Sequence, residues 1–172
     1  MPIYRLGDLR PNVHPDAYVH PDAVVIGDVT IGAESSVWPQ AVLRGDRGPI
    51  TVGERTSIQD GTVVHVTNTF PTTIGDGCVV GHLAHLEGCT VEDEVLIGSG
   101  SIVLHEAVVH RGATVAANAV IPNRTDVPAA ALAVGVPVVI KEGRSSLDLI
   151  RGSAAVYVEN GRRFRNEQER IG

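Results

Sequence analysis

Aromatic side chains are scarce in this sequence, since Phe, Trp and Tyr together make up only 3% of its 172 residues. A core without large rings has to be filled by thin layers of aliphatic side chains, which favours stacked strands over packed helices. Long apolar runs are missing as well, and the N-terminus lacks the charged segment and apolar stretch of a signal peptide. We therefore expect a cytoplasmic protein that does not insert into a membrane.

Basic runs and cysteine motifs are also absent. The formal net charge is −6, and no cluster of basic residues with interleaved aromatic rings is present, so we expect no nucleic-acid partner. The two cysteines, Cys78 and Cys89, have a spacing that matches neither a CxxC redox pair nor a zinc knuckle. We expect both to be buried free thiols.

Aliphatic residues are abundant, and they recur every six positions. The repeat contains only Val, Ile and Leu, and it breaks register three times, the last break being a one-residue slip before Val91. Its members are Val13, Val19, Val25, Ile31, Val37 and Leu43, then Val52, Ile58 and Val64, then Ile74, Val80 and Leu86, then Val91, Ile97, Val103, Val109, Val115 and Ile121.

A six-residue repeat of this kind predicts an all-β solenoid. Each repeat supplies one short strand with an inward aliphatic residue, followed by a corner that needs Gly, Asn or Asp. Three repeats make a triangular coil of about eighteen residues, and coils stack at the spacing of neighbouring strands. The sequence therefore predicts a parallel β-helix over residues 1–140, with Val134–Ile140 as a last partial coil.

Residues 141–172 are predicted to form a C-terminal helix that packs on the β-helix within the same domain. Apolar residues recur there at intervals of three and four, and Ser145 or Ser146 is placed to cap the helix. Gly152 and Gly161 weaken the helix, so packing on the β-helix has to stabilise it. The apolar residues concerned are Leu147, Ile150, Ala154, Tyr157 or Val158, and Phe164.

Three of the seven histidines gather around the longest interruption of the repeat, Thr67 to Thr73. These are His65, His82 and His85. The other four lie in ordinary repeats, where a structural or surface role is expected. They are His14, His20, His105 and His110.

Counting three sides to a coil places Leu86 directly over Val64. His65 and Glu87 each follow their inward residue by one position, so both should point outward from neighbouring strands, about 5 Å apart. His82 lies on the preceding side and faces away from them. A single chain would not easily bring His82 to His65, but a three-fold trimer could.

Over nearly its whole length the chain resembles the γ-class carbonic anhydrases. The motifs that carry the resemblance are Arg44-Gly45-Asp46 ahead of Pro49, Ser57-Ile58-Gln59-Asp60-Gly61, Val64-His65, Gly81-His82 and Gly88-Cys89. The resemblance implies a left-handed β-helix and a homotrimer with a divalent ion, Zn²⁺ or else Fe²⁺ or Co²⁺, held at each subunit interface by three histidines. It also implies reversible hydration of CO₂ to bicarbonate.

The same resemblance assigns roles to individual residues. Two of the family's metal ligands match His65 and His82. Arg44 and Asp46 resemble its charged pair at the subunit contact. Polar residues that line its pocket correspond to Gln59 and Asp60, and a tyrosine from its C-terminal segment corresponds to Tyr157.

Several positions depart from the family pattern. The third ligand position reads Glu87, a histidine stands two residues earlier at His85, and Arg47 replaces an acidic residue. The acidic loop of the family is replaced by the short segment 66–72, and Glu159 stands at an Asn position. These departures affect both the metal shell and the path by which a proton leaves the site.

Three readings of the metal site follow from these departures. Glu87 is the third ligand, in a shell of two histidines and one carboxylate; or His85 takes that place; or the site binds no metal. A carboxylate ligand would add a negative charge, which raises the pKa of the bound water and slows turnover near neutral pH. Two other functions remain open: an acyltransferase of the same repeat architecture with a histidine base, and a catalytically silent structural trimer.

Overall fold

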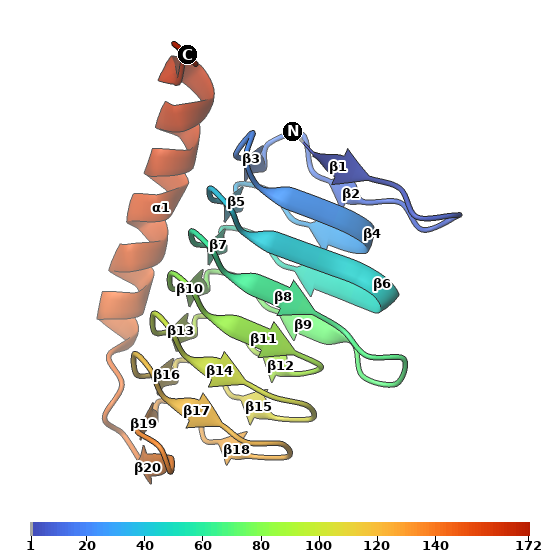
Figure 1. The fold of residues 1–172 in the computed structure, drawn as a ribbon. Coiled ribbons are helices and arrows are strands. Elements are labelled where there is room, and N and C mark those ends of the chain that lie inside the picture. The colour runs from blue at the N-terminus through green and yellow to red at the C-terminus, as the bar shows by residue number, and fades with distance from the viewer. Residues whose placement is uncertain (1) are drawn as a thin grey trace.

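The computed structural model describes residues 2–172 and shows a parallel β-solenoid with one long helix lying along its side (Figure 1). The predicted all-β solenoid with a C-terminal helix is thereby confirmed. The two chain ends lie at the same end of the molecule, because the helix runs back along the stack of coils (Figure 1).

The solenoid has three faces. The first consists of β1 (Ile3–Tyr4), the start of β4 (Val24–Ile31) and of β6 (Val42–Val52), β8 (Val63–His65), β11 (His85–Glu87), β14 (Ile102–Val103) and β17 (Val120–Ile121). The second consists of β2 (Asn12–Val13), the ends of β4 and β6, β9 (Thr72–Ile74), β12 (Thr90–Val91), β15 (Val108–Val109) and β18 (Asp126–Val127). The third consists of β3 (Tyr18–Val19), β5 (Ser36–Val37), β7 (Ser57–Ile58), β10 (Val79–Val80), β13 (Leu96–Ile97), β16 (Thr114–Val115), β19 (Leu132–Val134) and β20 (Val139–Lys141).

The register of the strands follows the predicted repeat. β8 and β11 pair in parallel with Val64 opposite Leu86, so the coil count across the long interruption is confirmed. Later strands pair at a regular interval, as in Leu96 opposite Thr114 and Ile102 opposite Val120. β4 and β6 are long enough to pair on two faces, which joins the first and second faces into one twelve-stranded sheet.

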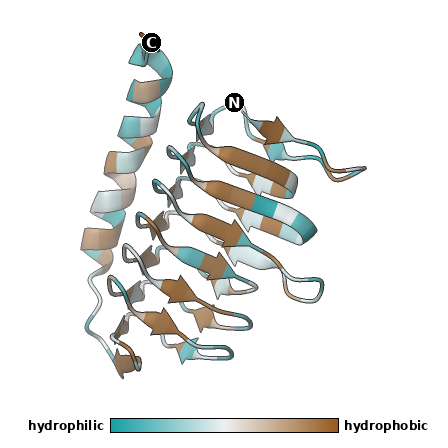
Figure 2. Ribbon diagram, in the orientation of Figure 1, coloured by the Kyte–Doolittle hydropathy of each residue, from teal (hydrophilic) through white to brown (hydrophobic). Residues whose placement is uncertain are grey.

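The core is a column of aliphatic side chains inside the coils. Every member of the predicted repeat from Val19 to Ile121 is buried, and Val13 in the first coil is half-buried against the same cluster. Figure 2 shows brown, apolar stretches on the strands of successive coils. Cys78 and Cys89 are free and buried, as expected, and burial raises the pKa of each thiol to about 12. Neither thiol is therefore a nucleophile at neutral pH.

The corners explain why the repeat tolerates so many glycines. In the later coils a residue with positive φ occurs every six positions. A left-handed backbone turns the chain sharply, and it favours Gly or Asn because they have the smallest steric cost there. The residues in question are Gly88, Glu94, Gly100, Glu106, Gly112, Asn118, Arg124 and Ala130.

The C-terminal end of the solenoid differs from the prediction. The repeat does not fade after Ile121, because Val127 and Ala133 are buried at the next two positions. The segment 134–140 does not form a further parallel coil. It turns back, and β19 and β20 pair antiparallel with Ala133 opposite Ile140. β20 is therefore the last strand of the third face, and it pairs with β19 alone.

The single helix, α1 (Leu147–Glu167), covers the third face (Figure 1). Ser146 is its N-cap and accepts a hydrogen bond from the backbone N–H of Leu149. Ile150, Ala154 and Gly161 are buried against the solenoid. Within residues 2–172, no helix is both long and apolar enough to cross a membrane.

Ion pairs fix the helix at two corners. Arg151 pairs with Glu94 at 2.6 Å, and Arg162 pairs with Glu34. Both glutamates occupy corner positions with positive φ, where any residue with a Cβ is strained. Their side chains reach the helix from those corners, which accounts for Glu where Gly would be easier.

Candidate metal centre

On the first face, the side chains that point outward from stacked strands include the pair predicted from the coil count. His65 ends β8 and Glu87 ends β11, and the two residues are direct partners in the parallel register. Nδ1 of His65 lies 2.9 Å from Oε1 of Glu87, a hydrogen-bond distance. Both side chains are partly buried. The structure therefore brings together two of the predicted metal ligands in one chain.

The next strand of this face adds the predicted charged pair. Arg44 on β6 is the register partner of His65, and Arg44 forms an ion pair with Asp46. Oδ1 of Asp46 lies 3.1 Å from Nε2 of His65. Both ring nitrogens of His65 thus lie within hydrogen-bond distance of a carboxylate oxygen. The imidazole is held in one orientation between Asp46 and Glu87.

The electrostatics keep both carboxylates ionised. Partial burial disfavours the charged form of Glu87, but hydrogen bonds from His65 and His85 together outweigh it and hold the pKa of Glu87 below its ordinary value. Burial acts in the same way on Asp46, and hydrogen bonds from His65 and Arg44 again lower its pKa. Both carboxylates are therefore anions, the form in which a carboxylate binds a divalent cation.

His85 also faces outward, as predicted, but it does not lie directly over His65 in the strand register. Its register partners on β8 and β14 are Val63 and Ile102. Nε2 of His85 lies 3.3 Å from Oε2 of Glu87. In the single chain, His85 therefore contacts the carboxylate of Glu87 rather than His65.

Sequence reasoning missed His105, which was expected to have an ordinary structural role. Its Nε2 lies 3.7 Å from Oε2 of Glu87, and this nitrogen is buried without a hydrogen-bond partner. The ring stacks on Phe70, with centroids 6.2 Å apart. The six-residue pattern carried no signal for this contact, because Phe70 comes from the loop that interrupts the repeat.

A second group of predicted residues lies next to the helix. Nδ1 of His82 lies 2.9 Å from Oδ2 of Asp60, and both side chains are about half exposed. Gln59 is buried, with 4% of its surface accessible. Burial, followed by the charge of Asp60, raises the pKa of Tyr157, while a hydrogen bond with Gln59 acts in the opposite direction. His82 and the three predicted pocket residues thus form one group.

Trp38 organises this second group, and sequence reasoning did not single it out. Its indole N–H lies 3.0 Å from the hydroxyl oxygens of both Ser36 and Ser57. Its ring packs edge-on against Tyr157 and Phe164 of α1, with centroids 5.7 and 5.0 Å away. Trp38 therefore fixes the helix and places the Tyr157 ring beside Gln59.

In the part of the chain that the structure describes, no group of three or more His, Cys, Asp or Glu side chains is arranged to hold a metal ion. His65 and Glu87 provide two donors on the first face, whereas His82 belongs to the group beside the helix. The donor types suit Zn²⁺, which accepts imidazole and carboxylate ligands.

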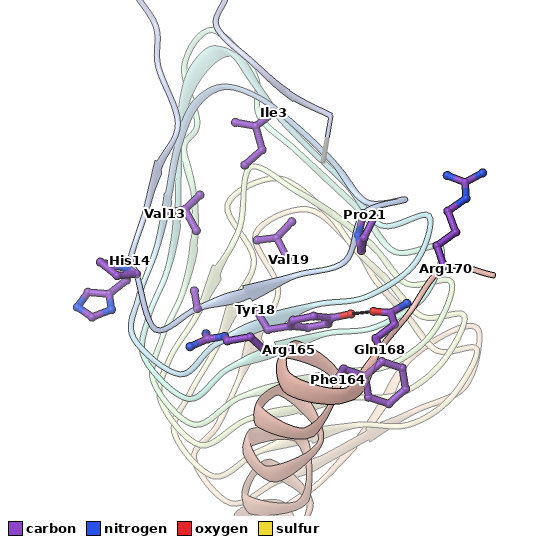
Figure 3. Close-up of a pocket in the computed structure, with 12 residues that line it drawn as sticks. Ile3, Val13, His14, Tyr18, Val19, Pro21, Phe164, Arg165, Gln168 and Arg170 are labelled. Carbon is purple, nitrogen blue, oxygen red and sulfur yellow. Dashed lines mark hydrogen bonds between the residues drawn. The ribbon is translucent and has the colours of Figure 1, made fainter. Parts of the chain in front are cut away.

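A separate hollow of about 660 Å³ opens at the N-terminal end, between the first coil and the end of α1 (Figure 3). Apolar side chains such as Val13, Val19 and Phe164 line it. The Tyr18 hydroxyl donates a hydrogen bond of 2.5 Å to Gln168 across its base (Figure 3). None of the predicted site residues lines this hollow.

The sequence matches a family model described as bacterial transferase hexapeptide (six repeats), over residues 10–45 and 88–123. The mitochondrial gamma carbonic anhydrase 2 of Arabidopsis thaliana is 46% identical over 127 residues, which are 70% of this chain and 46% of that protein. The chain belongs to the hexapeptide-repeat family, among relatives named γ-class carbonic anhydrases. It spans about half the length of the curated relatives it matches.

Solved structures of the family have the same fold. A Bacillus cereus protein suggested to be an acetyltransferase superposes with a TM-score of 0.94 at 30% identity, covering 96% of this chain and 98% of the other. A hexapeptide transferase family protein from Anaplasma phagocytophilum gives 0.89 at 34% identity, covering 94% and 96%. Both superpositions cover the β-solenoid and the helix, so these two proteins share the architecture of this chain.

Proposed function

We propose that this chain forms a homotrimer that binds one divalent metal ion at each subunit interface and hydrates CO₂ to bicarbonate. The ligands in this proposal are His65 and Glu87 of one subunit and His82 of the next. The metal is Zn²⁺ or another divalent ion such as Fe²⁺ or Co²⁺. Support comes from the relatives named carbonic anhydrases and from the donor types at these positions.

One observation carries the proposal: the 2.9 Å contact between His65 and Glu87 on neighbouring strands. A carboxylate in hydrogen-bond contact with an imidazole is a preorganised pair of ligand atoms. The pair is anchored from behind, since the Thr72 hydroxyl donates to the His65 carbonyl and accepts from the backbone N–H of Gly88. A metal ion needs little rearrangement of the backbone to use it.

Exposed apolar side chains next to the His65–Glu87 pair and next to His82 favour contact with a partner chain at both places. Val63 lies beside His65 on β8 and is 38% exposed, and Leu83 follows His82 and is 72% exposed. Leu83 also has a positive φ of 57°, an unusual backbone for a leucine. Large apolar side chains flanking an incomplete polar site are typical of an oligomer interface.

The remaining residues have supporting roles in this proposal. A bound divalent ion supplies the positive charge that lets water ionise near neutral pH. Asp60 orients the His82 ring through Nδ1, which leaves Nε2 free to act as a ligand. Gln59 orients the reactive oxygen through its amide, and Tyr157 lines the pocket from the helix. Arg44 and Asp46 form the charged pair at the subunit contact.

An acyltransferase is the second candidate, because both solved relatives carry transferase descriptions. In that reading His82 serves as a general base and Asp60 orients it. Acetyl transfer from acetyl-coenzyme A in the absence of any metal would favour this candidate. A trimer with neither activity would be structural.

Metal analysis of the purified protein tests the proposal. We expect about one Zn²⁺ per chain, and loss of most of it in His65→Ala and in His82→Ala, since two protein ligands hold zinc weakly against water. His14→Ala, on the first coil, is the matched control and should keep its metal. CO₂ hydration should fall with the metal content. Full metal content in both variants would exclude these two histidines as ligands and overturn the proposal.

A further inference from the structure

We propose that His105 is a positioning residue for Glu87: with His85 it holds one carboxylate oxygen, Oε2, and leaves Oε1 for the metal ion. This inference rests on the proposed metal site. It explains how a carboxylate can take the place of the family's third histidine. No feature of the six-residue repeat requires a histidine at position 105.

The two oxygens of Glu87 have different surroundings. Oε1 faces His65, its proposed co-ligand, at 2.9 Å. Oε2 faces Nε2 of His85 at 3.3 Å and Nε2 of His105 at 3.7 Å. Three imidazoles therefore surround one carboxylate, two of them on the oxygen that points away from His65. That division leaves one oxygen for coordination and gives the other to ring N–H donors.

Two neighbours, Phe70 and Gly88, hold His105 in this place. Its ring stacks on Phe70 with an interplanar angle of 26°. Gly88 lies beside both residues, and a Cβ there would come within 3.0 Å of the Phe70 Cβ and 3.2 Å of the His105 Cδ2. Gly88 also has a φ of +62°, so both the space and the backbone require glycine. The interrupting loop and this corner together form a slot for the His105 ring.

The imidazole in this slot has a ring nitrogen without a partner. Nε2 of His105 is buried and makes no hydrogen bond, and a buried polar atom without a partner is unfavourable. The acceptor it faces is Oε2 of Glu87, and a hydrogen bond requires the two atoms to approach to about 2.9 Å. A ligating carboxylate is normally fixed by such hydrogen bonds on its second oxygen. In the structure, Nε2 of His105 lies 3.7 Å from that oxygen.

The contact between His105 and Glu87 matters because of the negative charge that the carboxylate brings to the site. Replacing a neutral imidazole ligand by a carboxylate adds one negative charge beside the cation. N–H donors on the free oxygen stabilise that charge and restrict the carboxylate to one orientation. His85 and His105 would thereby make Glu87 behave more like a monodentate, fixed ligand. The change at position 87 and the two histidines then form one functional unit.

A double-mutant cycle on the trimer tests the inference, with Zn²⁺ affinity measured by competition against a chelator. His105→Phe keeps a ring against Phe70 but removes the donor, and should weaken Zn²⁺ binding about 10-fold or more. His105→Gln keeps an N–H donor and should restore most of the affinity. When Glu87→His is already present, His105→Phe should change the affinity less than about twofold, because the carboxylate is gone. His110→Phe is the control, since His110 also lies between carboxylates but on the second face.

The outcomes separate this inference from the proposed function. If the wild-type trimer binds no Zn²⁺, the proposed metal site fails and the inference fails with it. If wild type binds Zn²⁺ but His105→Phe has no effect, the site stands and the role of His105 is wrong. An equal loss with and without Glu87→His would show that His105 acts only through folding. The inference is supported if His105→Phe lowers Zn²⁺ affinity only when Glu87 is present and His105→Gln restores that affinity.

Discussion

Glu87 determines the charge of the proposed site, and its substitution separates the two candidate third ligands. Glu87→Gln removes the charged metal ligand next to His65, whereas His85→Ala removes only a contact with Oε2 of Glu87. We expect Glu87→Gln to lower Zn²⁺ affinity by more than His85→Ala does. Equilibrium dialysis of both variants measures this. If His85→Ala emptied the site and Glu87→Gln left it full, the assignment of Glu87, which lies over His65, as the third ligand would be wrong.

Glu87→His tests the effect of charge at the same position. Both side chains start from the same Cβ direction, so three imidazoles can surround the metal with little backbone movement. The variant has one negative charge fewer beside the ion, so the bound water should ionise at a lower pH. We expect the pH profile of CO₂ hydration to shift to lower pH and its rate at neutral pH to rise. A variant that binds Zn²⁺ but stays inactive would locate the defect in proton transfer, since Arg47 and the loop 66–72 offer no carboxylate there.

His110 gives a prediction about stability and pH. Hydrogen bonds from its ring to Asp126, and then to Glu92, outweigh burial and raise the pKa of His110 above 6.5. A raised pKa in the folded state means that the stabilisation is fully present below about pH 6.5 and is lost as the pH rises through the folded value. We expect His110→Gln to be less stable than wild type at about pH 6, with a smaller difference at about pH 9. Urea unfolding at both pH values measures this, and an equal difference at both would assign the effect to packing.

Individual residues also mark the limit of sequence-based prediction. The His65–Glu87 pair was predictable, because both residues follow an inward residue by one position and the coil count places one directly over the other. His105 was not, because its contacts depend on the left-handed corner at Gly88 and on Phe70 in the loop. Trp38 was missed for a similar reason. Its partners, Tyr157 and Phe164, are more than a hundred positions away and come from a different element.

At the level of elements, the strands were predictable and the ends of the solenoid were not. An inward residue every six positions determines the core, whatever occupies the corners. The terminal coil has no neighbour on its outer side, so the chain is free to turn back, and residues 139–141 pair antiparallel instead of continuing the stack. No local pattern distinguishes Val139 and Ile140 in a hairpin from the same residues in another coil.

The two glycines of the helix have different environments and therefore different predictions. A Cβ at Gly152 would meet nothing within 4 Å, whereas one at Gly161 would lie 3.5 Å from the Tyr18 Cβ and 3.6 Å from the Ser36 Cβ. Gly152→Ala should raise the free energy of unfolding by about 0.5–1 kcal/mol, because alanine loses less backbone entropy in a helix. Urea unfolding checks the value. No gain in stability would mean that helix propensity does not limit this element.

The matched variant at the second glycine is Gly161→Leu. Its side chain would extend into space already filled by Tyr18 and Ser36, so the helix would have to move away from the third face. We expect a loss of stability and also a change in Trp38 fluorescence, because Trp38 packs on the same stretch of helix. An unchanged spectrum with lower stability would place the strain elsewhere in the chain.

For the whole molecule, the decisive question is which chain completes the metal site. His65 and Glu87 lie on the first face and His82 beside the helix, and no three-ligand group exists within residues 2–172 of one chain. A three-fold axis is the simplest closed symmetry that repeats one heterologous contact three times. We expect light scattering to give about three times the 18.1 kDa chain mass. A monomer at the same concentration would remove the basis for a shared site.

Mixing two inactive variants tests the shared site directly. His65→Ala trimers and His82→Ala trimers should each lack metal, because every interface is missing one ligand. After the two are unfolded together in equal amounts and refolded, an interface is intact when a His65→Ala subunit contributes His82 to a neighbour that contributes His65. Random assembly makes this arrangement at about one interface in four, so about a quarter of the wild-type Zn²⁺ content and CO₂ hydration should return. Refolding each variant alone is the control and should restore neither. A site built within one chain could never be repaired in this way, since each subunit would still carry its own defect, and a mixture that stays empty would therefore contradict the interface.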